Sequence, residues 1–178
     1  MKDRCPIFVS KSGSHSELER SSLLEIEILR LTGHDAASMS MLLCSVDKEY
    51  SKYFTPFSFD VESLYGILSK AIKDLYFGVY VGKRLSGFYM LRGFDEGFET
   101  PSYGVWISPE FSRVGLATLT LSHCFAVCKL NGIKKVMLKV NPDNLAAKLT
   151  YEHCGFVQTG IDSKNGQLIY HKLIGGLS

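Results

Sequence analysis

The fold of this chain is decided by the segment Ser-Arg-Val-Gly-Leu-Ala, residues 112–117. The apolar residues 103–108 precede it and predict a strand, which Pro109 ends because proline cannot continue a sheet ladder. Gly115 admits a sharp turn, and apolar side chains then recur at helical spacing from Leu121 to Cys128. The segment therefore predicts a strand, a glycine-bearing turn and a helix in direct succession.

The start of that helix is a candidate anion site. A helix N-terminus leaves about four N–H groups without partners and carries roughly half a positive charge, so a pyrophosphate fits there. Gly115 would let the backbone approach phosphate oxygens because it has no Cβ, and Thr118 would add a hydroxyl. An ordinary strand-to-helix connection, in which Gly115 only relieves crowding, is the alternative interpretation.

A second segment, Asn-Leu-Ala-Ala-Lys-Leu-Thr-Tyr-Glu-His-Cys-Gly-Phe at residues 144–156, predicts a later short helix. Asn144 and Tyr151 are two helical turns apart, so the amide and the phenol are expected on one side of this helix. Tyr151 considered alone would more often be a packing aromatic. Its position relative to Asn144 favours a cleft-facing one.

Together the two segments resemble the coenzyme A site of the general-control-related N-acetyltransferases, the GNAT superfamily. In that family the late helix opens with Asn, a small residue follows at +3 and Tyr at +7, and Gly-Phe stands at +11 and +12. The matching residues here are Asn144, Ala147, Tyr151, Gly155 and Phe156. The turn departs from the family pattern, which has Gln or Arg where this chain has Ser112, next to Arg113. The resemblance covers residues 24–174 in element order and is specific over residues 103–156.

The resemblance and the element order imply an α/β (α+β) fold. We expect a mixed, mostly antiparallel sheet of about six to seven strands, with helices on both faces and a splayed parallel strand pair at its centre. Strands are expected at residues 24–29, 75–81, 85–91, 103–108 and 135–140, with Asp60 capping a helix. Two closing strands flank Asn165-Gly166, which predicts a two-residue hairpin turn. Residues 1–21 are interpreted as a loose polar leader and residues 22–178 as a single N-acetyltransferase domain.

Composition narrows the class of protein. The chain has 178 residues, of which 46% are hydrophobic and 21% charged, as expected for one globular domain. A net charge of +2 without a basic block argues against nucleic-acid binding, and no apolar run approaches the roughly 18 residues of a membrane span. Five cysteines without metal-like spacing indicate reduced thiols, no metal site and a cytoplasmic location. The oligomeric state stays open, with a homodimer among the states the sequence allows.

The resemblance implies acetyl-CoA as co-substrate. Backbone amides from Arg113 to Thr118 would hold the pyrophosphate, and Val105 and Ile107 would pair with the pantetheine amides. The Ile107 N–H is expected to hold the oxyanion of the attacked thioester. Tyr151 would donate a hydrogen bond to the departing sulfur, since a phenol of pKa about 10 is a weaker acid than a thiol of about 8.5. The expected coenzyme-binding residues are Val105, Trp106, Ile107, Arg113, Val114, Gly115, Leu116, Ala117, Thr118, Asn144 and Tyr151.

The general base and the acceptor wall are harder to predict. Two places where relatives carry a glutamate hold Ser102 and Lys139 instead. The loop of residues 92–101 offers the candidate bases Asp95, Glu96 and Glu99, of which Glu99 is the expected one. His123 and Glu49 are less favoured, each of these groups could simply be a solvated charge, and an amine of low pKa would need no base. Aromatic side chains of residues 50–59 suit a sugar or nucleotide ring. The expected acceptor-binding residues are Tyr50, Tyr53, Phe57, Asp95, Glu96 and Glu99.

The sequence therefore predicts an acetyl-CoA-dependent N-acetyltransferase that transfers acetyl directly to a primary amine of a small molecule. An amino sugar or sugar nucleotide is the favoured acceptor, and a protein N-terminus or lysine is the alternative. A non-catalytic coenzyme-A-binding or interaction domain is the alternative from another class. Cys124, Cys128 and Cys154 occupy apolar or terminal helix positions, which argues against an acyl-cysteine intermediate.

Overall fold

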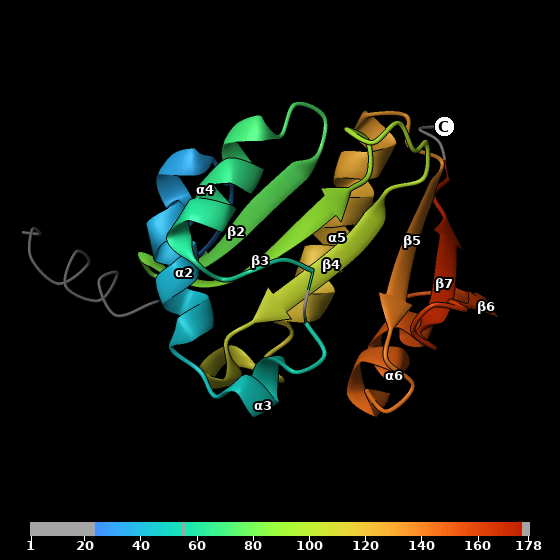
Figure 1. Ribbon diagram of the computed structural model, residues 1–178. Coiled ribbons are helices and arrows are strands. Elements are labelled where there is room, and N and C mark those ends of the chain that lie inside the picture. Colours follow the sequence, from blue (N-terminus) through green and yellow to red (C-terminus); the bar gives the residue numbers. More distant parts are fainter. Residues whose placement is uncertain (1–23, 55, 176–178) are drawn as a thin grey trace, which may run out of the picture.

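The computed structural model describes residues 24–54 and 56–175, which form one seven-stranded sheet with helices on both sides (Figure 1). The predicted leader, residues 1–21, lies outside the described residues. The strands are β1 (Ile26–Arg30), β2 (Leu75–Val81), β3 (Arg84–Arg92), β4 (Ser102–Ile107), β5 (Lys135–Val140), β6 (Val157–Ile161) and β7 (Leu168–Leu173).

The sheet is mixed and mostly antiparallel, in the order β1-β2-β3-β4-β5-β7-β6. Every neighbouring pair runs antiparallel except β4 and β5, which are parallel. The predicted fold class, with its one parallel pair at the centre, is confirmed. The predicted strands at 75–81 and 135–140 have the expected bounds, and the others shift by one or two residues.

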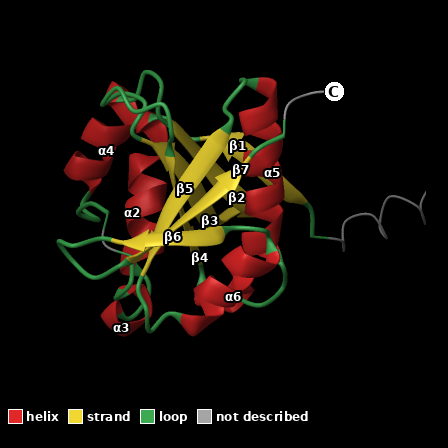
Figure 2. Ribbon diagram, turned by 90° about the vertical axis from the view of Figure 1, so that its right-hand side faces the viewer, coloured by secondary structure: helices red, strands yellow, loops and turns green. Residues whose placement is uncertain are grey.

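The helices divide between the two faces of the sheet (Figures 1 and 2). One face carries η1 (Gly33–Asp35), α2 (Ala36–Cys44), α3 (Lys48–Ser51) and α4 (Val61–Lys70), and the other carries α5 (Leu116–Leu130) and α6 (Leu145–His153). Each layer buries its own apolar core. Leu64 and Met39 pack against Phe88 on the first face, and Cys124 and Cys128 pack against Leu138 on the second.

The parallel pair at the centre of the sheet is incomplete. β4 and β5 share one bridge, Ser102 with Met137, beside a bond from the Met137 N–H to the Pro101 carbonyl at 3.0 Å. Beyond that bridge the strands separate toward their carboxyl ends, while β3–β4 and β5–β7 remain paired along their length. The splay therefore opens the sheet where the glycine turn follows β4.

Two local predictions have different outcomes. Asp60 caps α4 as expected, accepting a hydrogen bond from the Ser63 N–H at 2.8 Å. The prediction of a two-residue turn at Asn165-Gly166 is wrong, because β6 ends at Ile161 and β7 begins only at Leu168. Asp162 accounts for the difference: its carboxylate accepts the Lys164 N–H, and its backbone bonds to Gly166 and Gln167 close a wider loop.

The loop between β3 and β4 lies at the end of the sheet opposite the splay (Figure 1). The Asp95 carboxylate there accepts the backbone N–H groups of Ile72, Lys73 and Asp74, which lead into β2. These bonds, that from Lys73 foremost, lower the pKa of Asp95. Asp95 therefore ties two loops together, which is a structural role that the sequence prediction did not assign to it.

Replacing Asp95 by Asn should lower the thermal midpoint of unfolding at pH 7 by a few degrees and leave the affinity for acetyl-CoA unchanged. A carboxyl whose pKa is lowered by folding stabilises the protein above its unfolded pKa of about 4, and that stability is lost as pH falls through the folded pKa. The difference between the two proteins in thermal unfolding should therefore shrink toward pH 3. A constant difference down to that pH would contradict this role.

Candidate active site

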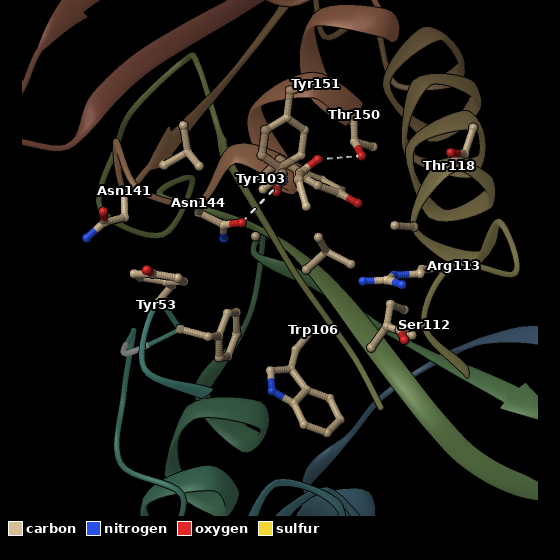
Figure 3. Close-up of a pocket in the computed structure, with 18 of the residues that line it drawn as sticks. Tyr53, Tyr103, Trp106, Ser112, Arg113, Thr118, Asn141, Asn144, Thr150 and Tyr151 are labelled. Atoms are coloured by element: carbon tan, nitrogen blue, oxygen red, sulfur yellow. Dashed lines mark hydrogen bonds between the residues drawn. The ribbon is translucent and has the colours of Figure 1, made fainter. Parts of the chain in front are cut away.

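A cavity of about 640 Å³ occupies the splay between β4 and β5 (Figure 3). Its lining comes from both faces of the sheet: from the turn before α5 and from α6 on one face, and from the segment around α3 on the other. Figure 3 shows Ser112, Arg113 and Thr118 on one side, Tyr53 and Asn141 on the opposite side, and Tyr151 between them. A molecule could therefore enter from either face and meet another in the gap.

The edge of β4 that faces the gap carries unpaired backbone groups. The Ser108 N–H donates to the Ser86 carbonyl at 2.8 Å, which fixes the phase of the β3–β4 ladder. Because successive residues of a strand direct their N–H and C=O groups to opposite sides, those of Val105 and Ile107 point away from β3. Both residues line the cavity, so their amides can bind a molecule lying in it.

The turn before α5 is shaped by two left-handed residues. Gly115 has φ of 91° and Arg113 has φ of 64°, a conformation that costs a non-glycine residue roughly 1–2 kcal/mol. No atom lies within 4 Å of where a Gly115 Cβ would be, so the glycine keeps this part of the cavity open. Arg113 thus lines the cavity in a strained backbone conformation, beside the free N–H groups at the start of the 15-residue helix α5. A cationic side chain next to a helix N-terminus suits an anion site.

Helix α6 begins at its cap, Asn144, whose side-chain oxygen accepts the Ala147 N–H at 3.2 Å. Two turns later Tyr151 also lines the cavity, and its ring makes edge contacts with Tyr103 and Phe156. Among the described residues no group bonds the Tyr151 hydroxyl. Burial raises the pKa of Tyr151 to about 12, so the phenol stays protonated at physiological pH.

The opposite side of the cavity is built by the segment around α3. The Tyr50 hydroxyl donates to the Ile107 carbonyl at 2.8 Å, and the Trp106 ring N–H donates to the Ser51 hydroxyl at 3.2 Å. These two bonds hold α3 against β4, although the helix has only four residues. Tyr50, Tyr53 and the neighbouring Phe54 thereby form an aromatic wall facing the gap.

Most of the predicted site residues line this cavity. Those that do are Tyr50, Tyr53, Val105, Trp106, Ile107, Arg113, Gly115, Ala117, Thr118, Asn144 and Tyr151. Val114 is instead exposed and Leu116 is buried against Val79 and Val81, so only their backbones can contribute.

The predicted acceptor residues beyond Tyr50 and Tyr53 need correction. Phe57 packs on the Arg92 guanidinium, 5.8 Å from the ring centre, and does not line the cavity. Asp95, Glu96 and Glu99 lie in the loop at the far end of the sheet, because β4 runs its full length between that loop and the glycine turn. Glu99 is therefore not placed to act as a base.

Sequence reasoning did not assign Asn141 and Thr150 to the site, and it noted Lys139 only as the residue that stands where relatives carry a glutamate. Lys139 and Asn141 lie at the carboxyl end of β5, where β5 has separated from β4. Their position at the end of the predicted strand was the signal that could have assigned them to the site. Two charged side chains line the cavity, Arg113 and Lys139. Among the described residues, no carboxylate and no histidine lines it. The charged side chains of the lining are thus one arginine and one lysine, and the lysine is paired with Asp162 outside the lining.

Comparison with known proteins agrees with this architecture. The sequence profile of the acetyltransferase (GNAT) family matches residues 43–156, more than half of the chain. The chain therefore belongs to the GNAT family of acetyltransferases, and the predicted family is confirmed. No curated protein sequence matches this chain.

Solved structures of the family are similar in fold at low sequence identity. The microcin C7 self-immunity acetyltransferase MccE, in complex with acetyl-CoA and AMP, has a TM-score of 0.70 and 20% identity over 84% of this chain and 93% of its own. Spermidine N-acetyltransferase from Vibrio cholerae, in complex with CoA and spermine, has a TM-score of 0.68 and 21% identity, covering 84% and 95%. Ribosomal-protein-S5-alanine acetyltransferase from Vibrio fischeri has a TM-score of 0.70 and 16% identity, covering 84% and 93%.

Replacing Gly115 by Glu should abolish acetyl-CoA binding measured by calorimetry, because a carboxylate would enter the open space where the phosphates are expected. The left-handed backbone alone would cost about 1–2 kcal/mol of stability. Gly132→Glu is the matched control, since Gly132 also has a positive φ of 69° and open surroundings but follows α5 at its far end. Equal coenzyme affinity in the two variants would contradict the assignment.

Proposed function

We propose that this protein transfers the acetyl group of acetyl-CoA directly to a primary amine of a small molecule. The observation that supports it best is the meeting of two groups at one cavity: the open amide of Ile107 on β4 and the protonated hydroxyl of Tyr151 on α6. The first is a donor for an oxyanion, and the second is a donor for a leaving sulfur. Both would stabilise negative charge that develops as a thioester opens.

The coenzyme fits the residues on the α5 side of the gap. The amides from Arg113 to Thr118 would hold its pyrophosphate, and the Arg113 guanidinium would add a charged hydrogen bond. The pantetheine would lie along β4 and pair with Val105 and Ile107, replacing the missing β5 partner. This arrangement carries the thioester through the splay toward the aromatic wall.

Transfer then follows from the geometry of this chain's donors. The amine lone pair attacks the thioester carbon, forming the C–N bond while the Ile107 N–H stabilises the oxygen that becomes negative. The nitrogen then loses its surplus proton to solvent water, collapse breaks the C–S bond, and the Tyr151 hydroxyl donates a hydrogen bond to the departing thiolate. A phenol of pKa about 12 keeps its proton beside a thiol of pKa about 8.5, so the sulfur leaves as thiolate.

The acceptor would bind on the α3 side of the gap. Tyr50 and Tyr53 offer aromatic faces there, which suit a sugar or nucleotide ring, so an amino sugar or a sugar nucleotide is the favoured acceptor. A protein N-terminus or lysine is the second candidate. The MccE structure with AMP and the ribosomal-protein enzyme show that this fold serves neighbours with different ligands and acceptors.

A non-catalytic coenzyme-binding role is disfavoured by Tyr151, which lines the cavity and whose hydroxyl has no hydrogen-bond partner among the described residues. We further propose a single catalytic domain over residues 22–178 and a cytoplasmic location. Along residues 24–54 and 56–175 no helix is long and apolar enough to cross a membrane. A homodimer is compatible with this proposal.

Replacing Tyr151 by Phe should reduce kcat by about 10²- to 10³-fold, the usual loss when one hydrogen-bond donor to a developing negative charge is removed. The ring contacts with Tyr103 and Phe156 remain in this variant, so the thermal midpoint and the coenzyme Kd should change little. Thiol release with a screened amine gives the rate, and calorimetry gives the Kd. A full-rate variant would assign Tyr151 to packing alone.

The rate of transfer should follow the protonation of the acceptor rather than that of an enzyme base. The described lining has no carboxylate or histidine, so an amine must arrive uncharged by its own equilibrium. We expect kcat/KM to rise tenfold per pH unit and to level off at the acceptor's own pKa. Two acceptors whose amine pKa values differ by about two units should give plateaus separated by as much. A shared plateau would reveal a base on the enzyme.

A further inference from the structure

Lys139 stands on the acceptor side of the cavity. On β5, Val136, Leu138 and Val140 point into the core beneath α5, so the alternation of a strand directs Lys139 to the face that carries α3. Lys139 and Asn141 line the gap from β5, while Tyr50 and Tyr53 line it from the opposite side. An acceptor lying on the aromatic wall would therefore face Lys139 on β5 across the gap.

The Lys139 ammonium is held in place by Asp162 from the β6–β7 loop. Its Nζ lies 2.6 Å from Asp162 Oδ2, and the other carboxylate oxygen accepts the Lys164 N–H at 2.9 Å. The Asp162 side chain is 11% exposed, whereas that of Lys139 is 41% exposed. The carboxylate is thus shielded behind the lysine. An ammonium has three donors, and within the described part of the chain Nζ uses only the one given to Asp162.

Of the two cationic side chains that line the cavity, Lys139 is the one on the acceptor side. Arg113 is at the α5 side, across the cavity from Asn141 (Figure 3), where the coenzyme phosphates are expected. No carboxylate among the described lining residues competes for Lys139 inside the cavity.

We propose that Lys139, fixed by Asp162, recognises an anionic group, phosphate or carboxylate, that the acceptor carries in addition to its amine. This inference rests on the proposed function and narrows its acceptor to amines of zero or negative net charge. Aromatic stacking on Tyr50 and Tyr53 and a charged hydrogen bond to Lys139 would together orient the amine toward the thioester. Lys139 is then a specificity-determining residue that acts in binding.

The test uses three sugars with the same amine: glucosamine, glucosamine 6-phosphate and 2-amino-2-deoxyglucuronic acid. Each is titrated by calorimetry into the full chain saturated with coenzyme A. The two anionic sugars should bind about 10- to 100-fold tighter than glucosamine, the effect of one charged hydrogen bond. The stronger of the two identifies phosphate or carboxylate as the recognised group. Equal or absent binding of all three sugars would overturn the proposal.

Variants of Lys139 separate its charge from its packing. Lys139→Met should remove the preference for the anionic sugars, and Lys139→Arg should retain most of it. Lys135→Met is the matched control, since Lys135 is exposed at the other end of the same strand and on the same face. Its sugar preference should equal that of the wild type. A preference that survives in a folded Lys139→Met protein would overturn the role of Lys139.

Failure of the proposed function would look different. In that case the wild-type chain would not bind coenzyme A, or would bind it and release no thiol from acetyl-CoA with any of the three sugars at saturating concentration. If only this inference fails, the protein will still bind coenzyme A and release thiol. The rates and affinities will then be the same for glucosamine and for the two anionic sugars. Asp162→Asn adds a further check, because freeing the Lys139 side chain should weaken binding of the anionic sugars and spare coenzyme binding.

Discussion

The structure depends on the hydrogen bonds that β4 and β5 do not make. A parallel pair at the centre of a sheet normally keeps its ladder, yet these strands share one bridge at Ser102 and Met137. The remaining strands compensate, since β3 and β7 pair with β4 and β5 along their outer edges. The gap is therefore rigid on both sides, and backbone amides that would have bonded a strand are free to bond a ligand.

This single opening separates the two halves of the site. The glycine turn, α5 and α6 supply backbone N–H groups, Arg113 and a protonated phenol on one face. Aromatic rings and a lysine held by Asp162 stand on the other. Among the described residues the cavity lining has no carboxylate and no histidine. Its charged side chains are Arg113 on one side and Lys139, paired with Asp162, on the other.

Much of this arrangement could be predicted from sequence because the features involved are local. Gly115 before a helical pattern, Asn144 two turns before Tyr151, and Asp60 before an apolar stripe each act within about ten residues. The misplaced carboxylates required long-range information. Asp95 looks like a loop charge in sequence, and only the fold shows that it accepts N–H groups from residues 72–74 at the far end of the sheet. The ion pair between Lys139 and Asp162 also joins residues 23 positions apart in the chain, so no local pattern could predict it.

The bond between the Tyr50 hydroxyl and the Ile107 carbonyl has a consequence for solubility. An unpaired strand margin is a template on which foreign strands add and aggregation begins, and proteins usually confine such margins to the rim of a sheet and shield them there. Here one lies in the interior, on β4. Tyr50 occupies one of its acceptors and lays α3 across the approach, which obstructs the addition of a second polypeptide to this strand.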